Sequence, residues 1–237
     1  MGYQQSTWGT VAQWAGALGT FSAVFVALFK DEILRRRRRP KLSISIKIEP
    51  PDSVKTIWNY QILGPNLQTF IPKQADCYFM RLWIENQGKT RAEKVQVFAS
   101  KLLKETETGT FHPVKNFLPM NLQWANSHEL FAEAISPYMG KHCDLGHVTI
   151  PSALTALQED HPDVPAGQTV LALDLEVKPT TKNHLIPPGT YLLELRIAGA
   201  NVLPVVTTLE IKLTGKWYDD AEKMFGDGIK LAITNRY

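Results

Sequence analysis

The chain has 237 residues, of which 44% are hydrophobic and 10% aromatic, and this composition excludes a largely disordered protein. The net charge of the chain is +3. Residues 30–39 carry Lys30 and five arginines against Asp31 and Glu32, a net charge of +4, so the net charge of residues 40–237 is −1. A nearly neutral domain lacks the basic surface of a nucleic-acid binder, and two cysteines are too few for a disulfide-rich secreted fold.

An uncharged stretch of 22 residues runs from Trp8 to Phe29. A helix of this length can cross the roughly 30 Å hydrocarbon core of a bilayer. Positive charge follows the stretch instead of preceding it, which disfavours a cleaved signal peptide. The sequence therefore predicts a single transmembrane helix within residues 1–39.

Consecutive arginines follow this stretch and set its predicted orientation. By the positive-inside rule we expect a single-pass protein of the inner membrane, with its N-terminus outside and its C-terminal domain in the cytoplasm. We also expect the arginines to contact lipid headgroups of the bilayer, the alternative being a plain stop-transfer signal without lipid specificity. These residues are Arg35, Arg36, Arg37, Arg38 and Arg39.

Small residues recur every four positions in the same stretch, at Ala15, Gly19, Ala23 and Ala27. Such a row lets two helix backbones approach closely, so it predicts homo-oligomers formed through the helix. The alternative is that the row arises by chance in a segment rich in alanine and glycine.

After Pro40 the hydrophobic period changes from helical to two, which indicates strands. We expect strands separated by turns, without intervening amphipathic helices, and this pattern favours an antiparallel β-sandwich over residues 40–237. A long irregular insertion is expected at about residues 105–169, and a short helix at 218–225. The expected strands are 42–48, 57–62, 78–86, 94–103, 170–177, 190–198, 205–213 and 229–233.

Two segments resemble parts of immunoglobulin-like domains. Residues 81–98 resemble a strand-turn-strand unit, and residues 186–197 resemble the entry to the penultimate strand. In the second segment Tyr191 occupies the place of a tyrosine corner, whose hydroxyl bonds back to the backbone. The fold class predicted is therefore mainly β, an immunoglobulin-like sandwich after one transmembrane helix.

The motifs LQW, HCDLGHV, PPGTY, TTLEIKLTGKW and DDAEKMFGDGI resemble an uncharacterised bacterial family of membrane-anchored proteins. The resemblance covers most of the chain from about residue 78 onward. It implies an anchored immunoglobulin-like domain with no established activity.

Imidazole and thiolate groups gather at His142, Cys143 and His147, and these are ligand types that zinc prefers. The spacing is poor, because an adjacent histidine and cysteine do not readily face one ion. The alternative is that Cys143 and Leu145 are buried in a strand while the histidines pack against neighbours or lie at the surface. We therefore predict no metal site and no cofactor. The chain also contains no nucleophile elbow, phosphate loop, dinucleotide fingerprint or H-E-x-x-H motif, so we expect no enzyme.

Three functions remain as hypotheses. The first is a membrane-anchored, non-enzymatic module that binds an unknown cytoplasmic protein or small ligand. The second is a membrane-disrupting effector of bacterial antiphage defence, in which the sandwich senses a signal and the helices cluster. The third is a metal-dependent enzyme.

Overall fold

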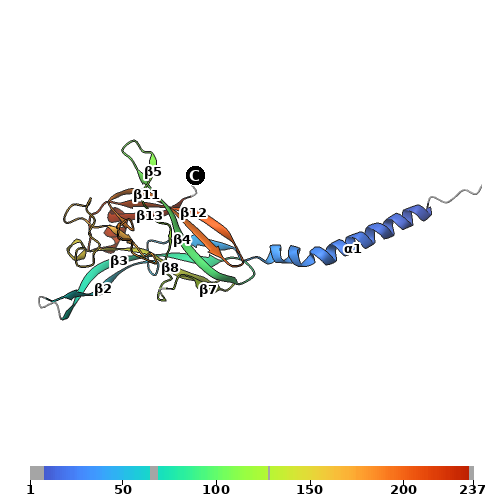
Figure 1. The fold of residues 1–237 in the computed structure, drawn as a ribbon, viewed down its shortest axis with the longest axis horizontal. Coiled ribbons are helices and arrows are strands. Elements are labelled where there is room, and N and C mark those ends of the chain that lie inside the picture. The colour runs from blue at the N-terminus through green and yellow to red at the C-terminus, as the bar shows by residue number, and fades with distance from the viewer. Residues whose placement is uncertain (1–7, 65–68, 128, 235–237) are drawn as a thin grey trace, which may run out of the picture. The chain divides into compact units, whose positions relative to one another are not determined.

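The computed structural model describes residues 8–64, 69–127 and 129–234. The described residues fall into two compact units, divided between Arg39 and Pro40 (Figure 1). The first unit contains one helix, α1 (Trp8–Arg38). The second contains the strands, a 3₁₀ turn (Pro151–Ala153), a short helix α2 (Ala221–Lys223) and the π-helical turn that continues it (Met224–Gly228).

The prediction of a transmembrane helix is wrong. No helix of the described residues is both long enough and apolar enough to cross a membrane, although α1 has 31 residues. The absence of charge in residues 8–29 does not make them strongly hydrophobic, because Gln13, Thr20 and Ser22 are polar and glycine and alanine add little apolar surface. The location in the inner membrane, which was inferred from this span, is overturned with it.

The arginines that follow the stretch belong partly to α1, but the side chains of residues 35–38 lie outside those that the structure describes. Their predicted contact with lipid headgroups depended on the span and loses its basis.

Two antiparallel sheets make up the second unit. The first sheet has the order β1-β3-β8-β9-β10, with β2 also paired to β3, and the second has the order β13-β12-β11-β4-β5, with β6 and β7 also paired to β4. The strands of the first sheet are β1 (Leu42–Ser45), β2 (Ser53–Leu63), β3 (Phe70–Asn86), β8 (Gly140–Thr149), β9 (Leu171–Leu173) and β10 (Leu185–Ile186). Those of the second are β4 (Ala92–Glu105), β5 (Phe111–Pro113), β6 (Met120–Asn121), β7 (Ala132–Ile135), β11 (Gly189–Gly199), β12 (Val202–Leu213) and β13 (Ile229–Thr234).

Alternate residues of both sheets meet in one hydrophobic core. Met80, Leu82 and Ile84 of β3 belong to the same buried cluster as Leu193 and Leu195 of β11. The alternation seen in the sequence sends these side chains inward because successive strand residues point to opposite faces. The prediction of a mainly β fold with antiparallel sheets is confirmed.

The range 105–169 is less irregular than expected, because it contains β5 to β8. Strand β8 pairs with β3 on one side and with β9 on the other, so it is a central strand of its sheet. The remainder of this range, from Pro151 onward, packs a second small cluster around Leu154 and Val170.

Strands β2 and β3 extend beyond the rest of their sheet as a two-stranded arm (Figure 1). Residues 70–76 of β3 pair only with β2, whereas residues 77–85 pair with β8. Several large apolar side chains of the arm are exposed, including Ile57, Leu63 and Phe70.

Asn86 joins three chain segments at the end of β3. Its fully buried side chain donates to the carbonyls of Thr90 (2.7 Å) and Ile135 (3.0 Å), and its Oδ1 accepts from the backbone nitrogens of Gly88 (3.0 Å) and Lys41 (3.2 Å). The side chain thus satisfies backbone groups that would otherwise be buried without partners.

We expect Asn86→Leu to lower the free energy of unfolding by about 2–4 kcal/mol, because it leaves several buried groups unpaired. Chemical denaturation measures the change. The control is Gln87→Ala, an exposed neighbour, which should change stability by less than about 0.5 kcal/mol. Equal effects of the two substitutions would contradict the role given to Asn86.

The tyrosine corner predicted at Tyr191 is not formed. The side chain is 1% exposed, but its hydroxyl has no hydrogen-bond partner among the described residues. Burial raises the pKa of this hydroxyl to about 12. One of the two patterns that favoured an immunoglobulin-like domain is therefore lost, and that finer assignment stays a prediction.

Because the hydroxyl of Tyr191 is buried without a partner, Tyr191→Phe should leave stability unchanged or raise it by up to about 1 kcal/mol. A melting curve of the variant beside the native chain measures this. A clear loss of stability would show that the hydroxyl makes a bond after all.

Candidate functional site

A β-bulge determines which side chains reach the outer face of the first sheet. Met80 pairs with Gly146 and Arg81 pairs with Asp144, so Leu145 is an extra residue in β8. Without the bulge, strict alternation would turn His147 into the core. With it, His147 lies opposite Phe79 on the outer face.

Gly146 is required next to this bulge. A Cβ atom at this position would lie 2.2 Å from the carbonyl oxygen of Ala172 in β9. The backbones of β8 and β9 therefore approach too closely for any other residue.

His147 is fully buried between two carboxylates. Its Nδ1 lies 3.0 Å from Oδ1 of Asp174, and its Nε2 lies 2.9 Å from Oε1 of Glu159. Glu159 comes from the covering segment, residues 150–170 between β8 and β9. Its second carboxylate oxygen accepts a hydrogen bond of 3.3 Å from Thr149. At the edge of this group Lys178 lies 3.4 Å from Oε1 of Glu159.

The imidazole is held in its charged form. Burial alone would lower the pKa of His147, but the hydrogen bonds to Asp174 and Glu159 and their charges outweigh burial and raise it to about 9. Burial likewise opposes ionisation of Glu159, yet its bond to His147 leaves the pKa of that carboxyl below its ordinary value. With both nitrogens donating, the ring is an imidazolium at neutral pH.

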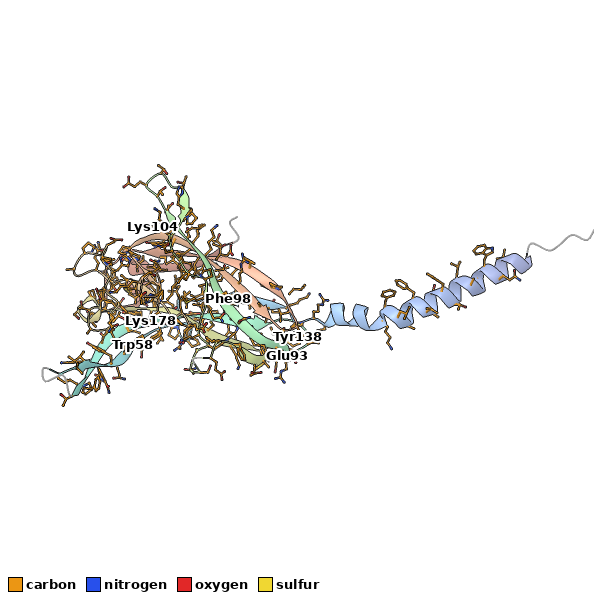
Figure 2. All side chains as sticks on the ribbon, in the orientation of Figure 1. Trp58, Glu93, Phe98, Lys104, Tyr138 and Lys178 are labelled. Carbon is orange, nitrogen blue, oxygen red and sulfur yellow. The ribbon has the colours of Figure 1, made fainter. Side chains whose placement is uncertain are left out.

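Aromatic rings cover this charged group. The Trp58 ring lies 4.3 Å from the His147 ring and is stacked on Phe79 at 5.4 Å, with 15° between the planes. Nζ of Lys178 lies 5.9 Å from the centre of the Trp58 ring, and Figure 2 shows the two residues side by side at the base of the arm. Trp58 thus connects the arm to the site.

A cavity of about 410 Å³ opens beside these rings. Oδ2 of Asp174, in the cavity wall, is buried and has no hydrogen-bond partner within the described ranges. Arg81 and Asp144 form an ion pair of 3.0 Å nearby. The lining residues are Trp58, Phe79, Gln123, Asp144, Asp174, Leu175, Glu176 and Lys178.

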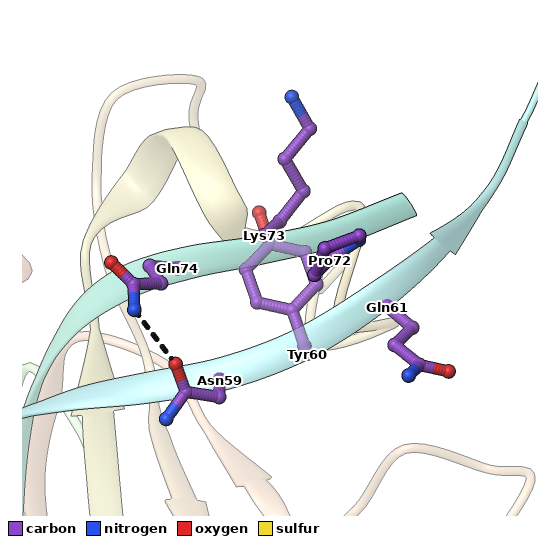
Figure 3. A pocket seen from close by; sticks show the side chains of 6 residues that line it. All are labelled: Asn59, Tyr60, Gln61, Pro72, Lys73 and Gln74. Atoms are coloured by element: carbon purple, nitrogen blue, oxygen red, sulfur yellow. Dashed lines mark hydrogen bonds between the residues drawn. The ribbon is translucent and has the colours of Figure 1, made fainter. Parts of the chain in front are cut away.

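A larger hollow, of about 790 Å³, lies across the arm (Figure 3). Its lining combines the Asn59–Gln74 hydrogen bond of 2.9 Å with Tyr60, Pro72 and Lys73. These side chains are largely exposed, and none is a buried ionisable group. We therefore place the candidate site at the cavity beside His147, where charge and aromatic surface converge.

The three residues considered as metal ligands do not come together. Cys143 points into the core, where its Sγ donates to the carbonyl of Gln123 at 3.3 Å, whereas His142 and His147 are on the outer face. His142 instead bonds Asp52 at 2.9 Å. In the described part of the chain no group of three His, Cys, Asp or Glu side chains is arranged to hold a metal ion.

Comparison with known proteins gives no relative: no family model, no curated protein and no solved structure matches the chain. The resemblance to a family of membrane-anchored bacterial proteins is therefore corrected, because no family model matches and the described residues contain no membrane-spanning helix.

Sequence reasoning missed most of the site. It named His147, but for a different chemistry, and it passed over Trp58, Glu159, Asp174 and Lys178. One signal was present: Asp174 interrupts the apolar run of residues 170–175, and a charged residue inside such a run usually has a buried partner.

The pKa of His147 predicts a pH dependence of stability. Since the folded pKa of about 9 lies above the ordinary 6.5, the contribution of this group is full below pH 6.5 and is lost as the pH rises through 9. The stability difference between the native chain and His147→Gln should therefore shrink by about 3 kcal/mol between pH 7 and pH 10.

Urea denaturation at the two pH values measures this difference. The control is His184→Gln: burial lowers the pKa of His184 to about 4, so this ring is neutral throughout the interval and its difference should stay constant. If the free energies of unfolding of the His147→Gln variant and the native chain change equally between the two pH values, the charged state assigned to His147 is refuted.

Proposed function

We propose that residues 40–237 form a non-enzymatic binding module that holds a small ligand in the cavity beside His147. The observation that carries the proposal is the buried Oδ2 of Asp174. This acceptor has no donor among the described residues and lies in the wall of a cavity whose other side is aromatic. A buried carboxylate oxygen without a donor is costly, and a ligand that supplies an N–H or O–H group relieves that cost.

The lining defines the chemistry of the ligand. Trp58 and Phe79 offer flat apolar surface, which favours a ring stacked against them. The carboxylates at Asp144, Asp174 and Glu176 outnumber the cations at the cavity, which favours hydrogen-bond donors over anions. A flat heterocycle that carries an amino group satisfies both conditions, and a volume of about 410 Å³ accommodates one.

The protonation states of the two cysteines and of His147 support binding over catalysis. Burial raises the pKa of the Cys77 and Cys143 thiols far above neutrality, so neither is a thiolate. His147 is already protonated and both of its nitrogens are engaged, so it does not serve as a general base.

The described residues give less support to the other two hypotheses, and both stay predictions. A membrane-disrupting effector needs a spanning helix, which the described residues do not contain. A metal-dependent enzyme at His142, Cys143 and His147 needs three ligands on one side of β8, and Cys143 is on the opposite face.

Calorimetric titration of the full chain with adenosine, a flat heterocycle with an amino group, tests the proposal. We expect saturable binding that Trp58→Leu weakens roughly tenfold or more, because the stacking surface is removed. The matched control is Tyr60→Leu, two residues further along the same strand and outside the lining of the cavity, which should leave binding unchanged.

Benzoate, a flat anion without an amino donor, should bind at least roughly tenfold more weakly than adenosine. The proposal fails if adenosine does not bind, if benzoate binds equally well, or if the two leucine variants behave alike.

A further inference from the structure

Every described side chain of α1, at Val11 and residues 13–30, is exposed. The large apolar ones are 44% to 72% exposed, from Phe29 to Phe21. An isolated helix gains little stability from its own hydrogen bonds, and most helices in proteins depend on packing of an apolar face. The apolar surface of α1 therefore calls for a partner.

Six of the nine large apolar side chains that are exposed on the described part of α1 follow a heptad pattern. They are Val11, Trp14, Leu18, Phe21, Phe25 and Leu28, at intervals of three and four residues in strict alternation. This spacing averages 3.5 residues and brings all six onto one stripe, as in the seam between two packed helices.

The predicted row of small residues is on another face. Successive helix residues are about 100° apart around the axis. The mean direction of the small-residue row therefore lies roughly 150° from that of the heptad stripe; the row is Ala15, Gly19, Ala23 and Ala27. No Cβ added at Gly19 would meet another atom, so this position is open. The two faces are therefore alternative contact surfaces that mutation can separate.

We propose that α1 pairs with α1 of a second copy of this chain through the heptad stripe. The heptad spacing selects a helix as the partner, and a stripe of this kind is complementary to itself. No charged side chain occurs from Trp8 to Phe29, so two copies meet without like charges in the contact. The ring contact of Phe25 with Phe29, at 4.5 Å, adds aromatic surface at one end of the stripe.

The size of the stripe sets the expected strength. Large aromatic side chains bury about 150–250 Å² each, and the six residues on each helix together remove on the order of 1,000 Å² from water when two copies pair. This is the lower end of specific interfaces, so the dimer should dissociate on dilution.

Sedimentation velocity of the full chain over a range of concentrations tests the proposal. We expect a reversible dimer whose dissociation constant rises roughly tenfold or more in the double variant Leu18→Ala, Phe21→Ala. The matched control is Val24→Ala, Val26→Ala, which removes apolar surface off the stripe and should leave the dimer intact. Alanine preserves helix propensity in both pairs, and circular dichroism confirms the helix.

Gly19→Ile distinguishes the two faces: it should leave the dimer unchanged if the heptad stripe is the contact, and should disrupt it if the small-residue row is. The proposal is overturned if the protein is a monomer at every concentration or if the Leu18→Ala, Phe21→Ala variant still forms the dimer. It is also overturned if the Val24→Ala, Val26→Ala control weakens the dimer as much as that variant does. None of these results depends on the cavity beside His147, so the ligand and the dimer are tested separately.

Discussion

The pairing of β3 with β8, interrupted by one extra residue, determines how the first sheet uses its two faces. On the inner side of the bulge, Cys143 and Leu145 complete the core between the sheets. On the outer side, His147 is placed where Asp174 and Glu159 reach both of its nitrogens. A strand that kept Leu145 but paired with β3 without the bulge would bring the imidazole into the apolar core, where neither carboxylate could meet it.

The buried imidazolium also explains how the covering segment is held. Glu159 belongs to this segment and Asp174 follows β9, so one side chain of β8 connects two stretches that no β-ladder joins directly. Buried ion pairs often add little net stability, because desolvation offsets their attraction, but they penalise arrangements that leave one partner unpaired. His147 therefore favours this particular packing of the covering segment over other apolar packings.

Regular alternation made parts of the fold predictable. Strands β11 and β12 and their inward residues Leu193 and Leu209 follow from a period of two in the sequence. Strand β8 is absent from the list of expected strands, although a strand with Cys143 and Leu145 buried was the alternative to a metal site. Its outer face is polar and yet buried by the chain itself, so HCDLGHV has neither an alternating nor a continuous apolar pattern. The error at α1 had a different cause: a segment without charge was assumed to be strongly hydrophobic.

The site was harder to predict, because it depends on contacts between residues far apart in sequence. Trp58, His147 and Asp174 come from three strands or their ends, and only the pairing of β2, β3, β8 and β9 brings them together. Tyr191 shows the converse: its sequence context matches a known corner, but the acceptor has to come from elsewhere and is not in place. Local motifs specify an element and its turn, and the partners of a side chain are determined by topology.

The arm formed by β2 and β3 has a consequence for how the cavity opens. Trp58 pairs with Ala75, in the part of β3 that has a neighbour on one side only. A two-stranded ribbon is marginally stable by itself, and such segments open locally at a small fraction of the free energy of global unfolding. One wall of the cavity thus belongs to a strand pair that has no further strand beside it, while the carboxylates opposite lie on or next to β8 and β9. Fraying of the ribbon from its tip toward Ala75 would expose the cavity to solvent and leave both sheets folded, so exchange of a bound molecule need not wait for the domain to unfold.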